Sequence, residues 1–237
     1  MTGTILNVFT ILIGGGVGLL FGAKLPDRIR ETSIWAMALF VIALGVKMTL
    51  QSQNTLISLG SVLLGGLLGE WWRIDAAITR AGSWLEARVA QNTTAEGTAR
   101  FIKGFVSSTL LFCVGPMAIL GAIDDGLRGS YQILAVKSLL DGVVAIAFSA
   151  SLGEGVLFAA LPVLIYQGGI SLLAAQAQAV LTTPMTTELT AAGGLLMMGI
   201  GVTMLELRPI RVANYLPALA IAPVMVAVLH AVGVAGF

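Results

Sequence analysis

The sequence predicts an all-α fold, a polytopic transmembrane helix bundle of about eight spans. Hydrophobic residues make up 57% of the 237 residues and charged residues 11%, and the mean hydropathy is +0.95. An ordinary soluble domain carries roughly 25% charged residues, so this much apolar surface needs a bilayer to cover it. The formal net charge of +1 gives no indication of nucleic-acid binding. The bilayer is therefore the first expected partner.

Eight apolar runs, separated by polar breaks, are long enough to cross the hydrocarbon core. They cover residues 4–22, 33–50, 54–70, 103–123, 131–152, 155–176, 188–205 and 214–235. Ten of the 13 Lys and Arg residues follow the first, third or seventh run. If successive runs cross the membrane in alternate directions, these ten residues share one side. The positive-inside rule makes that side cytoplasmic, so we expect both termini on the opposite side. The first run lacks a basic leader and a cleavage site, so we interpret it as a retained helix.

The segment 73–100 between the third and fourth runs is too polar to span. Its apolar residues recur at helical spacing, beginning with Ile74 and Ile78, which predicts a cytoplasmic amphipathic helix on the membrane surface. A solvated linker helix is the alternative. In either case we expect residues 1–237 to form a single transmembrane domain.

Small residues at four-residue spacing predict close helix packing. Gly14, Gly18 and Gly22 follow this pattern in the first run, and Gly65 and Gly69 do so in the third. Such stripes let two backbones approach where lipid provides no hydrophobic drive. The partner is either another helix of the chain or a second subunit, and we favour a homo-oligomer, a dimer first.

Glycine and proline also predict broken helices. The fourth run contains Gly115-Pro116, the sixth contains Tyr166-Gln167-Gly168-Gly169, and the eighth contains Pro217 and Pro223. Breaks in the fourth and eighth runs fit a parallel four-plus-four repeat, a transporter pattern, although proline kinks are ordinary in membrane helices.

Lys137 and Asp141 stand one helical turn apart in the fifth run. At 1.5 Å per residue, Asp141 lies roughly 15 Å in from Tyr131, near the middle of the core. A charge at that depth faces a bundle interior or a wet cavity, and it marks either a transport path or a structural clamp. We interpret the pair as the centre of an ion or substrate pathway.

Three further polar residues are candidates for the same pathway. Gln167 in the sixth run and Asn214 at the start of the eighth either line a polar path or join helices by hydrogen bonds. Asp125 belongs to a glycine-rich segment, expected as a loop, that either attracts cations at the mouth or forms a solvated turn paired with Arg128.

Several strings resemble one family. LFCVGPMAILGAIDDGLRG, VKSLLDGVVAIAFSASLGEGV, YQGG, GGLLGEWWRID and IRVANYLPAL are similar to the bacterial membrane family called domain of unknown function 554, over about residues 7–223. The resemblance implies a multi-pass protein of the bacterial inner membrane and marks Asp125, Lys137, Asp141, Gln167 and Asn214 without giving them roles.

We expect a transporter or permease for a small ion or polar solute, coupled to protons or sodium through Lys137 and Asp141. The alternatives are a dimeric ion channel and a non-catalytic membrane scaffold. We expect no enzyme, because the chain contains no catalytic motif and one histidine. No motif predicts a cofactor or a metal site, and the single cysteine, Cys113, excludes a Cys-based metal cluster.

Overall fold

The computed structural model describes residues 1–22, 26–80, 95–113 and 116–232. All regular structure in these ranges is helical, and none of the described residues forms a strand. The all-α prediction is confirmed.

Packing divides the helices into two compact units. The first comprises Met1–Met37 and Thr79–Ala177, and the second comprises Ala38–Ile78 and Gln178–Phe237. The helix α2 (Asp27–Thr49) begins in the first unit and ends in the second. The single transmembrane domain over 1–237 stays a prediction.

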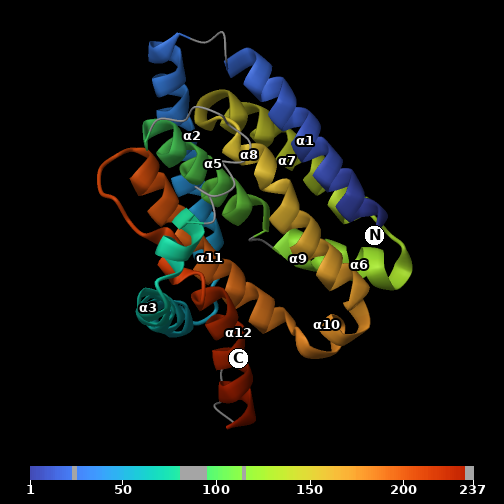
Figure 1. Cartoon of the computed structure of the whole chain (residues 1–237). Coiled ribbons are helices and arrows are strands. Elements are labelled where there is room, and N and C mark those ends of the chain that lie inside the picture. The colour runs from blue at the N-terminus through green and yellow to red at the C-terminus, as the bar shows by residue number, and fades with distance from the viewer. Residues whose placement is uncertain (23–25, 81–94, 114–115, 233–237) are drawn as a thin grey trace. The chain divides into compact units, whose positions relative to one another are not determined.

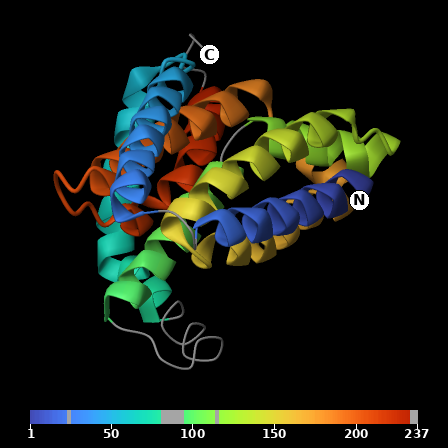
Figure 2. The same ribbon diagram turned by 90° about the horizontal axis from the view of Figure 1, so that it is seen from above.

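The first unit is built around two parallel helices, α1 (Thr2–Gly22) and α7 (Gln132–Leu152), which run side by side (Figures 1 and 2). Gly3 lies beside Leu134 at one end of this pair, and Gly22 lies beside Ala150 at the other. The remaining helices of the unit are α5 (Ala95–Cys113), α6 (Pro116–Arg128), α8 (Gly155–Phe158), α9 (Ala160–Leu172) and the start of α10 (Ala174–Val180). Of these, α9 packs on α6 and on α1.

The second unit contains the end of α2, α3 (Thr55–Trp72), α11 (Thr183–Met204), the 3₁₀ helix η1 (Val212–Tyr215) and α12 (Ala218–Ala231). α12 packs against both α3 and α11. Their shared core includes Ile57 of α3, Ala192 of α11, and Ala222 and Val226 of α12.

The spans agree with the predicted number. In the described part of the chain, seven helical stretches are long and apolar enough to cross a membrane, and α5 with α6 forms an eighth if the two, bent by 59°, make one span. The residues of the predicted break, Gly115 and the one before it, lie outside the described residues. The bent pair and the succession of η1 and α12 are compatible with broken fourth and eighth spans.

The predicted break at Tyr166–Gly169 is wrong. α9 continues through these residues, and Leu173 N still donates to Gly169 O at 3.0 Å. Pro162 is the third residue of α9, within the first turn, where a proline removes no intrahelical hydrogen bond. The interruption in this span lies instead at Ala159, between α8 and α9.

Most of the amphipathic segment predicted over 73–100 cannot be compared, because residues 81–94 lie outside the described ranges. Arg73 ends α3 in a left-handed conformation with φ of 54°. Residues 74–80 are helical, and the last six residues of the predicted segment form the start of α5.

Candidate functional site

Glycines set the spacing of α1 and α7. A Cβ added to Gly14, Gly18 or Gly22 would overlap the backbone carbonyls of Gly142, Ile146 and Ala150, in that order. The partner of this stripe is therefore another helix of the same chain. Because the two backbones touch, polar side chains on α1 are brought within hydrogen-bond distance of those on α7.

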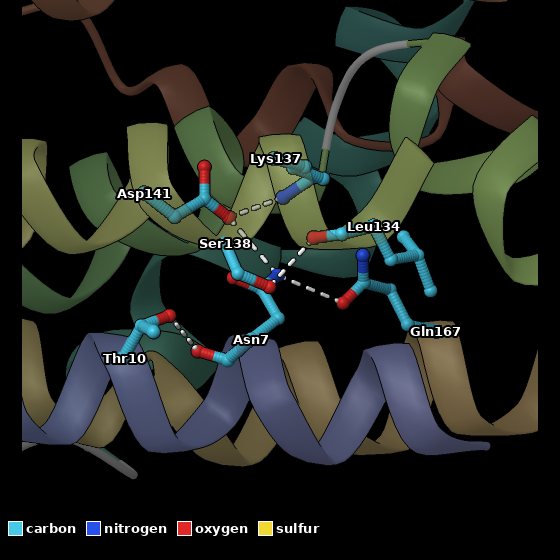
Figure 3. Close-up of polar contacts among 7 residues, drawn as sticks. All are labelled: Asn7, Thr10, Leu134, Lys137, Ser138, Asp141 and Gln167. Atoms are coloured by element: carbon cyan, nitrogen blue, oxygen red, sulfur yellow. Dashed lines mark hydrogen bonds and ion pairs between the residues drawn. The ribbon is translucent and has the colours of Figure 1, made fainter. Parts of the chain in front are cut away.

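A polar network joins three helices of the first unit at this contact (Figure 3). On α7, the ammonium of Lys137 pairs with Asp141 Oδ2. From α1, Asn7 Nδ2 donates to Asp141 Oδ2 and to Gln167 Oε1 of α9, both at 3.0 Å. The structure thus brings Lys137, Asp141 and Gln167 together, and it adds Asn7 as their link.

The network is deeply buried. Asn7 and Gln167 are 0% exposed, Lys137 is 6% and Asp141 8% exposed. Asp141 is the tenth of the 21 residues of α7, as expected for a group near mid-membrane. At this depth the lysine and the carboxylate offset each other's charge, whereas either one alone would carry a large desolvation cost.

Hydrogen-bonding capacity remains unused around this pair. Asn7 Oδ1 and Gln167 Nε2 are buried without a partner in the described part of the chain. Asp141 uses Oδ2 for both of its contacts, and within the same residues Oδ1 has none; Figure 3 shows this second oxygen turned away from Asn7. Buried polar groups are normally paired. The network therefore has acceptors and a donor available for a proton, a cation or a small polar solute.

Asp125 lies in α6, not in the loop that the sequence predicted, and it is buried. Its Oδ2 accepts from the backbone N of Gly3 at 3.0 Å and lies 3.2 Å from Met1 N. Arg128 pairs with Asp124, at 3.4 Å, one turn away along α6. Asp125 thus attaches the start of α1 to α6 and is not an open carboxylate at a mouth.

Asn214 lies in the second unit and has partners of its own. Its Nδ2 donates to Glu70 Oε2 at 2.6 Å, and its Oδ1 accepts from Asp75 N at 2.7 Å. Arg211 pairs with Glu70 Oε1 at 2.7 Å. Here Gly69 lies against the backbone of Asn214 itself, so this cluster joins the end of α3 to η1.

The Asp75 carboxyl beside this cluster has a raised pKa. Burial is the largest cause, and Glu70 raises the pKa further while Arg211 lowers it. The folded protein therefore binds this proton more tightly than the unfolded chain does. The stability that this group contributes is present below its unfolded pKa and falls as the pH rises through the raised one.

Gly65 of the third-run stripe lies against Ala218, the first residue of α12. Like the α1 stripe, the pair Gly65 and Gly69 therefore packs within the chain. The described residues contain no group of three or more His, Cys, Asp or Glu that could hold a metal ion.

The family is shown by comparison with known proteins. A family model described as "Protein of unknown function (DUF554)" matches residues 2–227. The chain belongs to the DUF554 family. This confirms the resemblance seen in the sequence strings.

Two known proteins are similar in sequence to this DUF554 protein over nearly its whole length. The chain is 30% identical over 237 residues to "Uncharacterized membrane protein YdfK" of Bacillus subtilis (strain 168), covering 98% of this chain and 99% of the relative. It is also 30% identical over 220 residues to "Uncharacterized protein YqgA" of Escherichia coli (strain K12), covering 93% and 94%. No solved structure matches the chain significantly. The first relative's name and the apolar helices agree that this is a membrane protein.

Sequence reasoning missed Glu188, near the start of α11 in the second unit. It is 1% exposed. Its Oε1 accepts from the backbone N of Gln53 at 2.7 Å and of Asn54 at 3.1 Å, and its Oε2 accepts from Ser52 Oγ at 2.7 Å and Ser58 Oγ at 2.9 Å. The available signal was a lone acidic residue at the edge of an apolar run. Glu188 fastens the α2–α3 connection to α11.

Two replacements of Glu188 distinguish its contribution as a hydrogen-bond acceptor from the contribution of its charge. Glu188→Ala leaves two backbone N–H groups and two hydroxyls without their acceptor, and we expect it to lower the free energy of unfolding by about 2 kcal/mol or more. Glu188→Gln keeps one carbonyl oxygen for the two N–H groups and should cost less than half as much. Thermal unfolding in detergent measures both, and equal losses would show that the charge, not the hydrogen bonding, matters.

Proposed function

We propose that this DUF554 protein is a membrane transporter for a small ion or polar solute. The observation that supports the proposal best is Asp141, a mid-span carboxylate with one oxygen occupied and the other without a partner in the described residues. Intramembrane carboxylates in helix bundles mark ion, proton and substrate paths. The unpartnered atoms of Asn7 and Gln167 extend the same polar centre.

The ion pair provides a way to couple two events. A proton or a sodium ion that binds Asp141 competes with Lys137 for the same carboxylate. Binding would therefore release the ammonium, and the freed lysine would favour a different arrangement of α1, α7 and α9. We further propose a location in the bacterial inner membrane and a homodimeric assembly.

A membrane scaffold is the second candidate, and one observation favours it. Lys137 and Asp141 are in direct contact and almost completely buried, as a structural clamp requires. The two candidates differ in what the charges do after folding. In a scaffold both charges can be removed together without loss of function, because no uncompensated charge remains. In a transporter Asp141 itself has to bind the cation.

Flux through the reconstituted protein tests the proposal. Liposomes containing the protein and a pH-sensitive dye are given sodium or L-serine, a small polar solute, in turn. We expect Asp141→Asn to abolish the coupled proton or sodium movement, since the amide keeps the volume and loses the titratable group. Because it leaves Lys137 without its counter-charge, we also expect a lower melting temperature, and flux is compared only for protein that elutes as folded. Asp124→Asn, which removes a half-buried carboxylate paired with the exposed Arg128, is the control and should transport normally.

The double variant Lys137→Met/Asp141→Asn separates the candidates. A transporter predicts normal stability with flux still lost. Full flux in the double variant would end the transport role of this pair. The scaffold would be favoured if the wild-type protein transported none of the solutes and the double variant regained stability.

A further inference from the structure

A second polar site lies in the first unit, beyond the end of the buried network. Ser149 is on the same face of α7 as Asp141, eight residues and thus roughly 12 Å further along the helix. A cavity of about 220 Å³ opens here, lined by Ser149, Ser151, Gly153, Glu154 and Arg100 together with the end of α1. The cavity belongs wholly to the first unit and, by the positive-inside assignment, faces the cytoplasm.

Two hydroxyls in this lining have no hydrogen bond. Ser149 and Ser151 are each 1% exposed, and within the described residues neither Oγ has a partner. A helical serine ordinarily bonds a carbonyl of its own preceding turn, as Ser138 does with Leu134 O at 2.6 Å. Both Oγ atoms are buried, and that of Ser149 faces Gly15 of α1. Each hydroxyl would therefore reach a molecule in the cavity through a change of its side-chain rotamer.

Both signs of charge line the same cavity. Arg100 lies beside Gly153, whose φ of 83° and missing Cβ leave room for the guanidinium. Glu154 is the next residue along the chain. Neither Arg100 nor Glu154 has an ion-pair partner among the residues that the structure describes, so the two do not neutralise each other across the cavity.

The volume of the cavity limits the size of the molecule that can bind in it. Sites for drug-sized ligands have volumes of about 300–1,000 Å³, and 220 Å³ corresponds to roughly seven water molecules at about 30 Å³ each. A small molecule with one anionic and one cationic group matches this volume and both charges. Its oxyanion would bind the Arg100 guanidinium and, after the change of rotamer, the serine hydroxyls, and its ammonium would bind Glu154.

We propose that this cavity binds a small zwitterion that carries an ammonium and a carboxylate or phosphate. The inference rests on the proposed transport function in one respect: it names the class of solute that would enter the pathway from the cytoplasmic side. The same chemistry is present in a free amino acid and in the headgroup of phosphatidylethanolamine, and the experiment distinguishes these two sources.

Binding to the purified protein in detergent is the first test. The probes are three molecules of similar size. L-serine carries both charges, propionate carries only the negative charge, and propylamine carries only the positive charge. We expect L-serine to bind and to raise the melting temperature, and each single-charge probe to bind at least about tenfold more weakly, because each lacks one charge-assisted contact. Propionate binding as tightly as L-serine would overturn the zwitterion assignment.

Variants show where the probe binds. Arg100→Gln and Glu154→Gln should each weaken L-serine binding by about tenfold or more, whereas Arg128→Gln, which removes an exposed arginine paired with Asp124, should not change it. Ser149→Ala/Ser151→Ala should weaken binding while leaving the melting temperature of the unliganded protein unchanged or higher, since the lost hydroxyls had no partner. Equal effects of Arg100→Gln and Arg128→Gln would overturn the site.

Nanodiscs test the lipid source. If L-serine does not bind, phosphatidylethanolamine should raise the melting temperature over that in pure phosphatidylcholine, and Arg100→Gln should remove the increase. The absence of both effects overturns the proposal. Asp141→Asn distinguishes the two proposals. Retained L-serine binding with lost flux supports both, whereas retained binding with normal flux removes only the coupling role of Asp141. Lost flux in a protein that binds none of the probes removes only this site.

Discussion

Lys137→Met is expected to destabilise the protein more than any other single charge removal in the first unit. It leaves the buried carboxylate of Asp141 with only the Asn7 amide as a partner. Breaking a buried ion pair by removing one member costs about 3–5 kcal/mol, because the remaining charge is uncompensated. We expect poor yield and a much lower melting temperature in detergent, with partial recovery at acidic pH, where Asp141 can take up a proton.

Lys47→Met is the matched control. Lys47 also lies within a membrane helix, near the end of α2, but it is exposed and has no ion-pair partner among the described residues. This variant should fold normally. The explanation by charge compensation fails if both lysine variants lose the same stability, or if adding Asp141→Asn to Lys137→Met restores none of it.

Gly18→Leu should prevent α1 from docking on α7. Even a Cβ at this position would overlap the carbonyl of Ile146, which belongs to the α7 backbone and cannot move aside as a side chain could. Overpacking a side-chain core costs roughly 1–3 kcal/mol, and a clash with backbone should exceed that range. Loss of the monodisperse elution peak and a lower melting temperature are the expected results.

Gly16 provides the control two residues away. A Cβ at Gly16 meets no atom within 4 Å, so Gly16→Leu should keep the wild-type elution volume and melting temperature. If Gly18→Leu behaved like Gly16→Leu, the helix contact that positions Asn7 beside Asp141 would have to be different.

The arrangement of α1 on α7 has a consequence for the candidate site. The glycines at positions 14, 18 and 22 allow the backbones to touch, and this contact brings Asn7 to Asp141 and Gln167. Gly18→Leu is therefore expected to remove function by separating the two helices, whereas Asp141→Asn is expected to remove function while the contact between α1 and α7 is kept. Comparing the two distinguishes the packing that builds the network from the chemistry of the network.

Features that depend on neighbouring residues could be predicted from the sequence. Hydropathy summed over one run is a local property, so the membrane class and the all-α fold follow from it. The pairing of Lys137 with Asp141 is also local, because one helical turn places the two side chains on the same face. The stripe of Gly14, Gly18 and Gly22 predicted a close helix contact for the same reason, although not its partner.

Local patterns were misleading where the position within an element mattered. Tyr166–Gly169 has the composition of a break, yet α9 continues through it, since Pro162 falls in the first turn of the helix. The segment around Asp125 has the glycines and acids of a loop, yet it is the last part of α6 and Asp125 is buried.

The sequence by itself determined the class of protein, its family resemblance and the charged pair at mid-span. Only the tertiary structure decided which residues surround that pair and which groups Glu188 accepts from. Asn7 and Gln167 are 160 positions apart in the chain, and Glu188 is 130 or more positions from its donors. It also placed Asn214 with Glu70. The physical reason is that contacts between distant segments depend on how whole helices pack, which no local window of residues specifies.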